Sequence, residues 1–502
     1  LILTLAGFIT RFIGFFYKIF LSKTMGAEWL GIYQLIFPVY GIAFTIYATG
    51  IQTSISRLVA AEMGKKNPKN VRKILGMGLI LSLTLAFLLS IMVYRFSDTI
   101  AFHFLLESRS AESLRILAIV FPFCAVTSCI NGYYYGLKKA GVPASTQLLE
   151  QLVRVIVVYI TAYIVGNGNL QVSCEMAVLG LVLGEIASCL YNFISLFVTK
   201  SPKNILYRES DPDGKILARR NIIRNILTLS IPLSTNRLLI NILHSIEAVL
   251  IPTMLRRYGL TSSEALISYG ILNGMSMPFI MFPTAIINAL SVLLLPTVSE
   301  AQAMENNSLI GKSSSVSIKY SLLIGILSSG VFLAFGKSLG NVIFHSQEAG
   351  NYLVILAWLC PLIYLATTLG SIINGLGKTH ITFINNIVGT LAKIGLIIFL
   401  IPHMGINGYL ISLLIGQLII TTMDAIYIVK NVRFHFDSVN SLLKPGIIVA
   451  MAGYLIKNIY DYLHKITQIK QTVFLLSFCL LFCVISIILF VITNTVSKSD
   501  FN

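Results

Sequence analysis

The chain has 502 residues; 56% of them are hydrophobic, only 11% are charged, and the mean hydropathy is +0.83. Soluble domains use roughly 25% charged residues, so this composition excludes an ordinary soluble protein. The formal net charge of +17, taken alone, would suit a protein that binds nucleic acid. The basic residues lie mostly in short polar breaks between apolar stretches, however, and this placement argues against nucleic acid as a partner.

Apolar stretches long enough to cross a bilayer recur from one end of the sequence to the other. A hydrocarbon core of about 30 Å needs roughly 20 apolar residues per helix. The stretches lack the alternating polarity of membrane β-barrel strands. The sequence therefore predicts an all-α integral membrane protein with 14 transmembrane helices, at residues 1–21, 31–55, 74–94, 114–136, 146–166, 176–198, 226–250, 266–290, 316–336, 351–373, 381–401, 406–428, 446–463 and 472–493.

Basic residues are most frequent in the breaks that follow even-numbered helices. The stretch "KKNPKNVRK" (65–73) follows helix 2, and the richest break, 200–224, follows helix 6. Since positively charged loops stay on the cytoplasmic side, both termini are predicted to be cytoplasmic. No cleavable signal peptide is evident, and because the sequence opens on Leu1 and not on methionine, further N-terminal residues are expected before it.

The sequence repeats itself at one constant spacing across several helices. The matched positions are Val59 with Val298, Leu117 with Leu356, Pro122 with Pro361, Gly136 with Gly375, and Arg154 with Lys393. With small shifts, "ILTL" (2–5) recurs at 226–229, and Gly184 lies opposite Gly416. Such a pattern indicates an internal duplication. Helices 1 to 6 and 7 to 12 are therefore predicted to form two lobes, which share one orientation because six is an even number.

The predicted organisation has four parts: an N-lobe at 1–199, a basic cytoplasmic linker at 200–225, a C-lobe at 226–430, and helices 13 and 14 with a tail at 431–502. The linker is polar enough to let the lobes move, and it is equally compatible with a solvated loop whose charges only fix topology. Prolines inside predicted helices, among them Pro122 and Pro361, permit kinks. They suit either helices that move or static bends needed for packing.

Among the basic residues inside predicted membrane helices, the candidates for a binding site are Arg11, Arg154, Arg237 and Lys393, in helices 1, 5, 7 and 11. A charge at the bilayer centre costs about 2.5 to 3.5 kcal/mol on insertion scales, so such residues normally face a polar cavity or a partner. The repeat relates Arg11 to Arg237 within two residues, so each lobe offers two cations. One prediction is a shared cationic chamber for a phosphate-bearing substrate. The alternatives are internal ion pairs and, for Arg154, snorkelling towards the helix end.

A second set of intramembrane residues gives candidates for binding a coupling ion or for internal ion pairs: Glu150, Glu185, His244 and Glu247. On helix 7, Arg237, Asn241 and His244 form one polar face, with Glu247 one turn further. Glu247 is a candidate ligand for a coupling cation, H⁺ or Na⁺, and a pair with Arg237 or His244 is the alternative. Asp424, near the cytoplasmic end of helix 12, is predicted to be a solvated cap.

The sequence contains no motif that would support chemistry on a substrate. It has no Walker A loop, no HExxH, no GxSxG in a suitable context, and no acidic loop typical of a metal-dependent glycosyltransferase. The cysteines lack the spacing of metal ligands and are interpreted as apolar packing residues. No cofactor or metal is predicted, and the protein is expected to move a substrate without converting it.

Three motifs then suggest a family. They are "TRFIGFFYKIFLSKTMGA" (10–27), "GIQTSISRLVAAE" (50–62) and "LLLPTVSEA" (293–301), at helix 1 and at the exits of helices 2 and 8. Together with the two six-helix lobes and two extra helices, they make essentially the full chain resemble the multidrug/oligosaccharidyl-lipid/polysaccharide (MOP) exporter superfamily. Within it the chain is similar to the group of stage V sporulation protein B and MurJ-type lipid II flippases.

The resemblance implies alternating access, in which a cavity takes the pyrophosphate and sugars of an undecaprenyl-linked precursor while its lipid tail stays in the bilayer. It implies that Arg11, the arginine of the helix 1 motif, binds the pyrophosphate. MurJ proteins also carry arginines in helices 2 and 8, whereas "GIAFTIYATG" (41–50) and "SYGILNGMSMPF" (268–279) have none here. Arg237 and Lys393 are candidates to compensate.

The leading expectation is a flippase for a lipid-linked oligosaccharide, lipid II or another peptidoglycan or spore cortex precursor, in the cytoplasmic membrane of a spore-forming bacterium. The absence of a nucleotide motif favours membrane potential or an H⁺ or Na⁺ gradient as the driving force, and the expected partners are the lipid-linked substrate and membrane lipids. The alternatives are a cation-coupled multidrug exporter of the same superfamily, a flippase for another polysaccharide repeat unit, and a non-transporting scaffold of spore envelope assembly.

Overall fold

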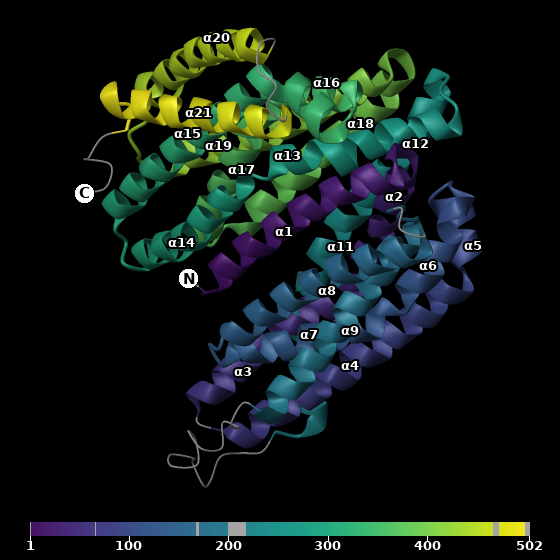
Figure 1. Cartoon of the computed structure of the whole chain (residues 1–502). Coiled ribbons are helices and arrows are strands. Elements are labelled where there is room, and N and C mark those ends of the chain that lie inside the picture. Colours follow the sequence, from purple (N-terminus) through teal and green to yellow (C-terminus); the bar gives the residue numbers. More distant parts are fainter. Residues whose placement is uncertain (1, 66, 167–169, 199–216, 465–470, 497–502) are drawn as a thin grey trace. The chain divides into compact units, whose positions relative to one another are not determined.

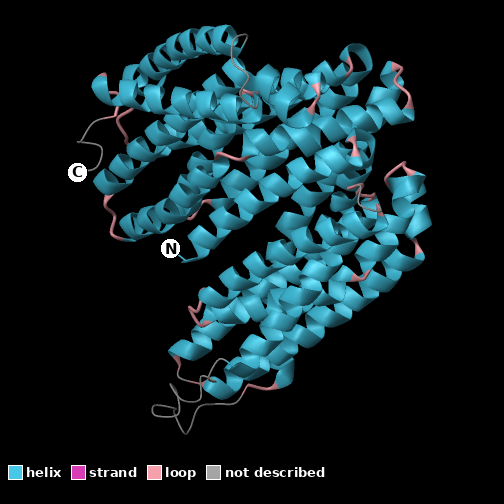
Figure 2. Ribbon diagram, viewed as in Figure 1, coloured by secondary structure: helices cyan, strands magenta, loops and turns pink. Residues whose placement is uncertain are grey.

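The computed structural model describes residues 2–65, 67–166, 170–198, 217–464 and 471–496. Throughout these ranges the regular structure is helical and no strand occurs (Figure 2). Helices satisfy their backbone hydrogen bonds within one segment, which is what a bilayer requires of a spanning element. The predicted all-α fold class is therefore confirmed.

The chain divides into two compact units, Leu1–Thr253 and Met254–Asn502. The first unit contains α1 (Ile2–Met25), α2 (Ala27–Phe44), η1 (Thr45–Thr49), α3 (Gly50–Gly64), α4 (Pro68–Arg95), α5 (Ser97–Thr99), η2 (Ile100–Phe104), η3 (Ser108–Ser110), α6 (Ala111–Ala118), α7 (Val120–Gly136), α8 (Gly141–Val165), α9 (Cys174–Val198) and most of α11 (Arg219–Tyr258).

The second unit begins within the last turns of α11. It contains α12 (Ser262–Gly270), η4 (Ile271–Ser276), α13 (Met277–Met281), α14 (Thr284–Ala303), α15 (Asn307–Leu339), η5 (Gly340–Phe344), α16 (Gln347–Leu356), α17 (Leu359–Gly375), α18 (Thr379–Met404), α19 (Ile406–Asn431), η6 (Val439–Leu443), α20 (Lys444–His464) and α21 (Gln471–Ile492).

Twelve helices of the described chain are long and apolar enough to cross a membrane, and there are up to 14 spans if each of two bent helix pairs counts as one. The bent pairs are α6 with α7, at 46°, and α16 with α17, at 50°. Counted in this way, the spans correspond to the 14 predicted helices. The eighth differs most from its prediction, because Pro278 and Pro283 accompany a break into α12, η4, α13 and α14.

Both bends have the same local chemistry. Pro122 and Pro361 cannot donate a backbone hydrogen bond, so in each case the carbonyl four residues earlier loses its helical partner. A serine of a neighbouring helix donates to each freed carbonyl: Ser90 Oγ of α4 to Ala118 O at 2.6 Å, and Ser329 Oγ of α15 to Ala357 O at 2.6 Å. Ser90, Ala118 and Pro122 are the repeat partners of Ser329, Ala357 and Pro361. The two units therefore share this hydrogen-bonding arrangement.

Two glycines that the repeat relates also share a packing environment. A Cβ atom added to Gly136 would lie 2.7 Å from Cβ of Val59, and one added to Gly375 would lie 2.8 Å from Cβ of Val298. Helices that approach this closely leave no room for a methyl group, so glycine is required at both positions. The valine over the glycine in each unit supports the repeat found in the sequence.

The long helix α11 contacts other helices of the first unit at separate points. Asn241 Nδ2 donates to Gly41 O of α2 at 3.2 Å and to Thr45 Oγ1 of η1 at 2.6 Å. Residues 226–253 therefore group with the first unit, whereas the sequence assigns them to the C-lobe. The predicted linker at 200–225 lies mostly outside the described residues, and the lobe boundary that it marks stays a prediction.

Helices α20 and α21, which lie outside the predicted repeat, pack against α15 within the second unit (Figure 1). The ring of Phe335 on α15 lies 5.7 Å from that of Tyr460 on α20 and 6.2 Å from that of Phe482 on α21, between ring centroids. At Gly330 the contact is closer still, since an added Cβ would lie 2.2 Å from Cγ1 of Val449. Aromatic rings and one glycine thus join the extra helices to the unit.

Candidate functional site

An ion pair lies on α8 in the first unit. The guanidinium Nη2 of Arg154 donates to Oε1 of Glu150, one helical turn earlier, and both side chains are mostly buried. This is the internal pair that the sequence left open as an alternative for Arg154. Nε of Arg154 is buried and has no hydrogen-bond partner in the part of the chain that is described.

Glu185 of α9 faces this pair and is only 7% exposed. Gly184 brings the two helices together, because an added Cβ would lie 2.8 Å from the carbonyl oxygen of Glu150. Glu185 interacts electrostatically with Cys124 of α7, while its Oε2 lacks a hydrogen-bond partner among the described residues. Glu150, Arg154 and Glu185, called the α8–α9 cluster below, carry one excess negative charge when all three are ionised.

Four tyrosines interact electrostatically with the α8–α9 cluster: Tyr17 of α1, Tyr33 and Tyr40 of α2, and Tyr47 of η1. Tyr40 Oη lies 3.3 Å from Cys124 Sγ, whereas the buried hydroxyls of Tyr17 and Tyr47 have no partner within the described ranges. Sequence reasoning missed these residues because tyrosine passes as an apolar ring in a membrane helix. The sequence did contain one signal: Tyr33, Tyr40 and Tyr47 are spaced seven residues apart, which places them on one helical face.

Arg11 and Arg237 are both exposed in the structure. On α1, Arg11 lies between the exposed ring of Phe8 and Gly14, which meets the side chain of Gln151 where α1 packs on α8. An exposed arginine in a membrane span needs a polar path or water beside it, because hydrocarbon solvates it poorly. Neither arginine joins the α8–α9 cluster.

His244 and Glu247 lie one turn apart on α11. Nδ1 of His244 is 3.4 Å from Oε2 of Glu247, with the histidine side chain 54% exposed and the carboxylate buried. The structure thus brings together the two residues for which an internal pair was one alternative. A role of Glu247 in ion coupling stays a prediction.

Lys393 lies on α18 of the second unit and is partly buried. Its stem packs on α19 at Gly416, where an added Cβ would lie 2.7 Å from Cβ of Lys393. Arg154 has the same relation to Gly184 of α9, where the corresponding distance is 3.4 Å. Lys393 and Arg154 are therefore repeat partners that also share a packing environment, since each packs on a glycine of the following helix. A chamber shared by all four cations stays a prediction.

Asp424 differs from its prediction as a solvated cap. It is 1% exposed and accepts a hydrogen bond of 2.7 Å from Nδ2 of Asn385 on α18. The reason is the length of α19, which continues beyond Asp424 to Asn431, so that this position packs against α18 and does not end the helix.

The fold matches solved transporters. A structure titled as the inward-facing conformation of a multidrug resistance MATE family transporter of the MOP superfamily has a TM-score of 0.70, with 18% identity, over 83% of this chain and 93% of that one. A structure of lipid II flippase MurJ in an inward closed conformation has a TM-score of 0.68, with 15% identity, over 99% of each chain. The fold is that of MOP-superfamily transporters and flippases.

The sequence places the chain in a family within that class. A model described as polysaccharide biosynthesis protein matches residues 1–302, more than half of the chain, so the chain belongs to this family. Relatives in Bacillus subtilis (strain 168) include stage V sporulation protein B, 26% identical over 92% of this chain and 89% of that protein, and lipid II flippase MurJ, 21% identical over 83% and 79%. The protein is thus a multi-pass membrane transporter or flippase of this superfamily and not an enzyme.

Proposed function

We propose that the protein is a flippase that moves an undecaprenyl-pyrophosphate-linked saccharide, lipid II or another peptidoglycan or spore cortex precursor, across the cytoplasmic membrane by alternating access. The similarity to stage V sporulation protein B and to lipid II flippase MurJ over most of all three chains supports this substrate class. Both termini are proposed to be cytoplasmic, and the linker at 200–225 to connect the two lobes on that side.

The observation that carries the proposal is the exposed arginine of helix α1. Arg11 lies in an otherwise apolar span, belongs to the motif that matches the flippases, and is not consumed by a buried ion pair such as that of Arg154. A guanidinium in this position can hold a pyrophosphate through paired, charge-assisted hydrogen bonds. Arg237 and Lys393 are proposed to complete the cationic surface for the diphosphate.

Transport of lipid II in proteoliposomes tests the proposal. Arg11→Ala is expected to lower the flipping rate about tenfold or more, because a hydrogen bond to a charged group contributes about 1.5 to 3 kcal/mol. Arg237→Ala and Lys393→Ala are expected to lower it less. The matched control is Arg224→Ala, an exposed arginine near the beginning of α11, which should leave the rate unchanged.

Two results would contradict this function. Equal flipping by all three variants and the control would exclude binding by these cations. No lipid II movement by the unaltered protein, together with ion-dependent export of cationic dyes, would favour a drug exporter instead.

The α8–α9 cluster favours a second candidate, a cation-coupled multidrug exporter. Its excess carboxylate, the partnerless Oε2 of Glu185 and the surrounding tyrosines form a site that a cation or proton could occupy. The same site is also compatible with a flippase driven by an H⁺ or Na⁺ gradient, so the transported substrate, and not the cluster, decides between the two functions.

A further inference from the structure

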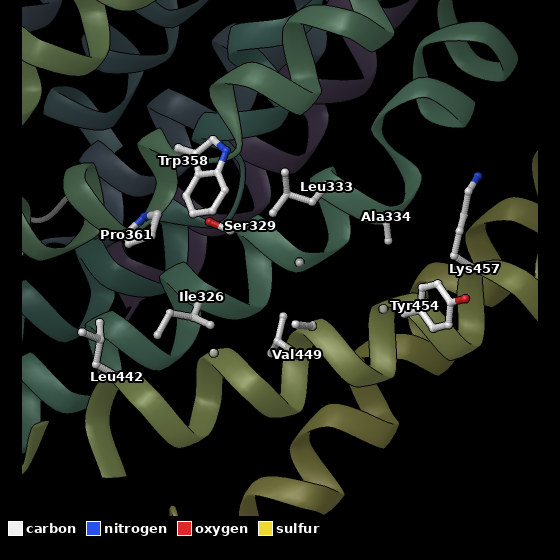
Figure 3. Close-up of a pocket in the computed structure, with 14 residues that line it drawn as sticks. Ile326, Ser329, Leu333, Ala334, Trp358, Pro361, Leu442, Val449, Tyr454 and Lys457 are labelled. Carbon is white, nitrogen blue, oxygen red and sulfur yellow. The ribbon is translucent and has the colours of Figure 1, made fainter. Parts of the chain in front are cut away.

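A groove of about 560 Å³ runs between α15, α20 and the bend that precedes α17 in the second unit (Figure 3). This volume lies within the roughly 300 to 1,000 Å³ of small-molecule sites. Its walls are apolar: Ile326 and Leu333 come from α15, and Val449 comes from α20. The groove remains open at Gly446, where an added Cβ would meet no atom within 4 Å.

The internal repeat shows how the groove arises. The face of the first unit that corresponds to it carries Phe87, Tyr94 and Ile119, the repeat partners of Ile326, Leu333 and Trp358, and their side chains are 54%, 56% and 48% exposed. In the second unit α20 lies over this face, because α20 and α21 have no counterpart in the repeat. The cover is partial: Leu333 is 40% exposed and Trp358 is still 62% exposed, so the face forms one wall of an open groove in the second unit.

The charged lining residue of the groove lies at one end. Lys457 and Tyr454 of α20 lie there, at the end opposite Leu442 (Figure 3). Nζ of Lys457 is 3.2 Å from Oδ1 of Asp461 and 3.4 Å from Oγ of Ser338, and it also lies over the ring of Tyr460. The lysine is partly buried and the aspartate is half-exposed, so a positive and a negative group stand side by side near the end of a membrane helix.

From this arrangement we infer that the groove binds a zwitterionic glycerophospholipid, with one acyl chain along the apolar channel and the phosphoethanolamine head group at Lys457 and Asp461. The phosphate pairs with the ammonium of Lys457, and the ethanolamine ammonium pairs with the carboxylate of Asp461.

The paired charges decide which lipid the site prefers. An anionic head group would meet the carboxylate of Asp461 beside the lysine, and this repulsion disfavours it. A head group with both charges satisfies both residues without leaving either unpaired. The inference goes beyond the proposed transport function, since it concerns a lipid that stays with the protein and does not cross the membrane on it.

Native mass spectrometry of the purified full chain tests the inference. After delipidation, the protein is titrated with phosphatidylethanolamine or with phosphatidylglycerol of the same acyl chains. We expect one phosphatidylethanolamine bound with at least about tenfold preference over phosphatidylglycerol. Gly446→Leu should abolish this binding by filling the groove. Asp461→Asn should weaken phosphatidylethanolamine and strengthen phosphatidylglycerol, which reverses the preference.

The matched control is Gly395→Leu, because Gly395 likewise lies in a membrane helix of the second unit with no atom within 4 Å of an added Cβ, but it is exposed and does not line the groove. Its lipid binding should equal that of the unaltered protein. Equal binding by Gly446→Leu and Gly395→Leu, or occupancy by undecaprenyl phosphate in place of phosphatidylethanolamine, would overturn the inference. Lipid II flipping measured on the same variants separates this result from the transport proposal.

Discussion

Ser90 and Ser329 are conspicuous at the level of single residues, because each hydrogen-bonds a carbonyl of another helix that a proline has freed. A buried carbonyl without a partner costs about 1 to 3 kcal/mol. Both serines are unremarkable in the sequence. Their role follows only from the proline four residues beyond the carbonyl that they reach.

Ser90→Ala should therefore lower the free energy of unfolding by about 1 to 3 kcal/mol. Ser329→Ala should lower it less, because Ala357 O also accepts a hydrogen bond of 3.2 Å from the backbone N–H of Cys360. The midpoint of thermal unfolding in detergent measures this loss for Ser90→Ala and Ser329→Ala. Ser477→Ala is the control, since Ser477 Oγ donates only to Val473 O of its own exposed helix. A loss for Ser477→Ala as large as for the other two would contradict the explanation.

Individual charges could be found in the sequence, but their partners could not. Glu150 and Arg154 were recognised as neighbours because one helical turn separates them. Glu185 and the tyrosines reach the cluster from other helices. The seven-residue spacing of Tyr33, Tyr40 and Tyr47 shows that they share a helical face, but not that this face contacts the cluster. Asp424 was misjudged for the same reason: the burial of its carboxylate depends on Asn385 of a neighbouring helix.

At the scale of helices, close pairs are built on glycines that the repeat relates. Gly136 lies under Val59, Gly375 lies under Val298, and Gly416 lies under Lys393. These contacts set the distance between the paired helices. The existence and order of the helices, in contrast, were predictable from hydropathy. Broken elements such as α12 to α14 were predicted less well, because prolines there interrupt a hydropathy pattern that is continuous.

Alanine at Gly136 or Gly375 should destabilise the protein by about 1 to 3 kcal/mol, because the added methyl group would overlap a valine and force the helices apart. Thermal unfolding in detergent again gives the measurement. Gly395→Ala provides the comparison: its Cβ would enter open space, so the higher helix propensity of alanine should leave the stability unchanged or raise it slightly. A comparable loss in all three variants would rule out the packing argument.

At the scale of the whole molecule, the number of spans and the duplication could be read from the sequence, since both rest on patterns that extend over hundreds of residues. The grouping of residues 226–253 with the first unit could not, because it depends on contacts such as that of Asn241 with Gly41 and Thr45. The groove beside α20 was likewise invisible, as it is formed by helices distant in the sequence.

Ion coupling is a property of the whole molecule that one substitution can test. Glu185→Gln keeps the shape of the side chain and removes the excess negative charge of the α8–α9 cluster. If that cluster takes up the coupling cation, substrate movement in proteoliposomes should continue but lose its dependence on an imposed H⁺ or Na⁺ gradient. Glu112→Gln, at an exposed glutamate of α6, should retain the dependence. An unaltered response to the gradient in Glu185→Gln would exclude the cluster as the coupling site.

The bends at Pro122 and Pro361 have a mechanical consequence. A proline kink in a membrane helix is usually regarded as a flexible joint, but neither of these bends can straighten without breaking a hydrogen bond to another helix. Each bend is therefore held by a hydrogen bond to a neighbouring helix. The bend between α6 and α7 is bonded to α4, and the bend between α16 and α17 is bonded to α15. A motion that straightened either bend would lose this hydrogen bond, worth about 0.5 to 1.5 kcal/mol net, so movement at other points of the chain is favoured.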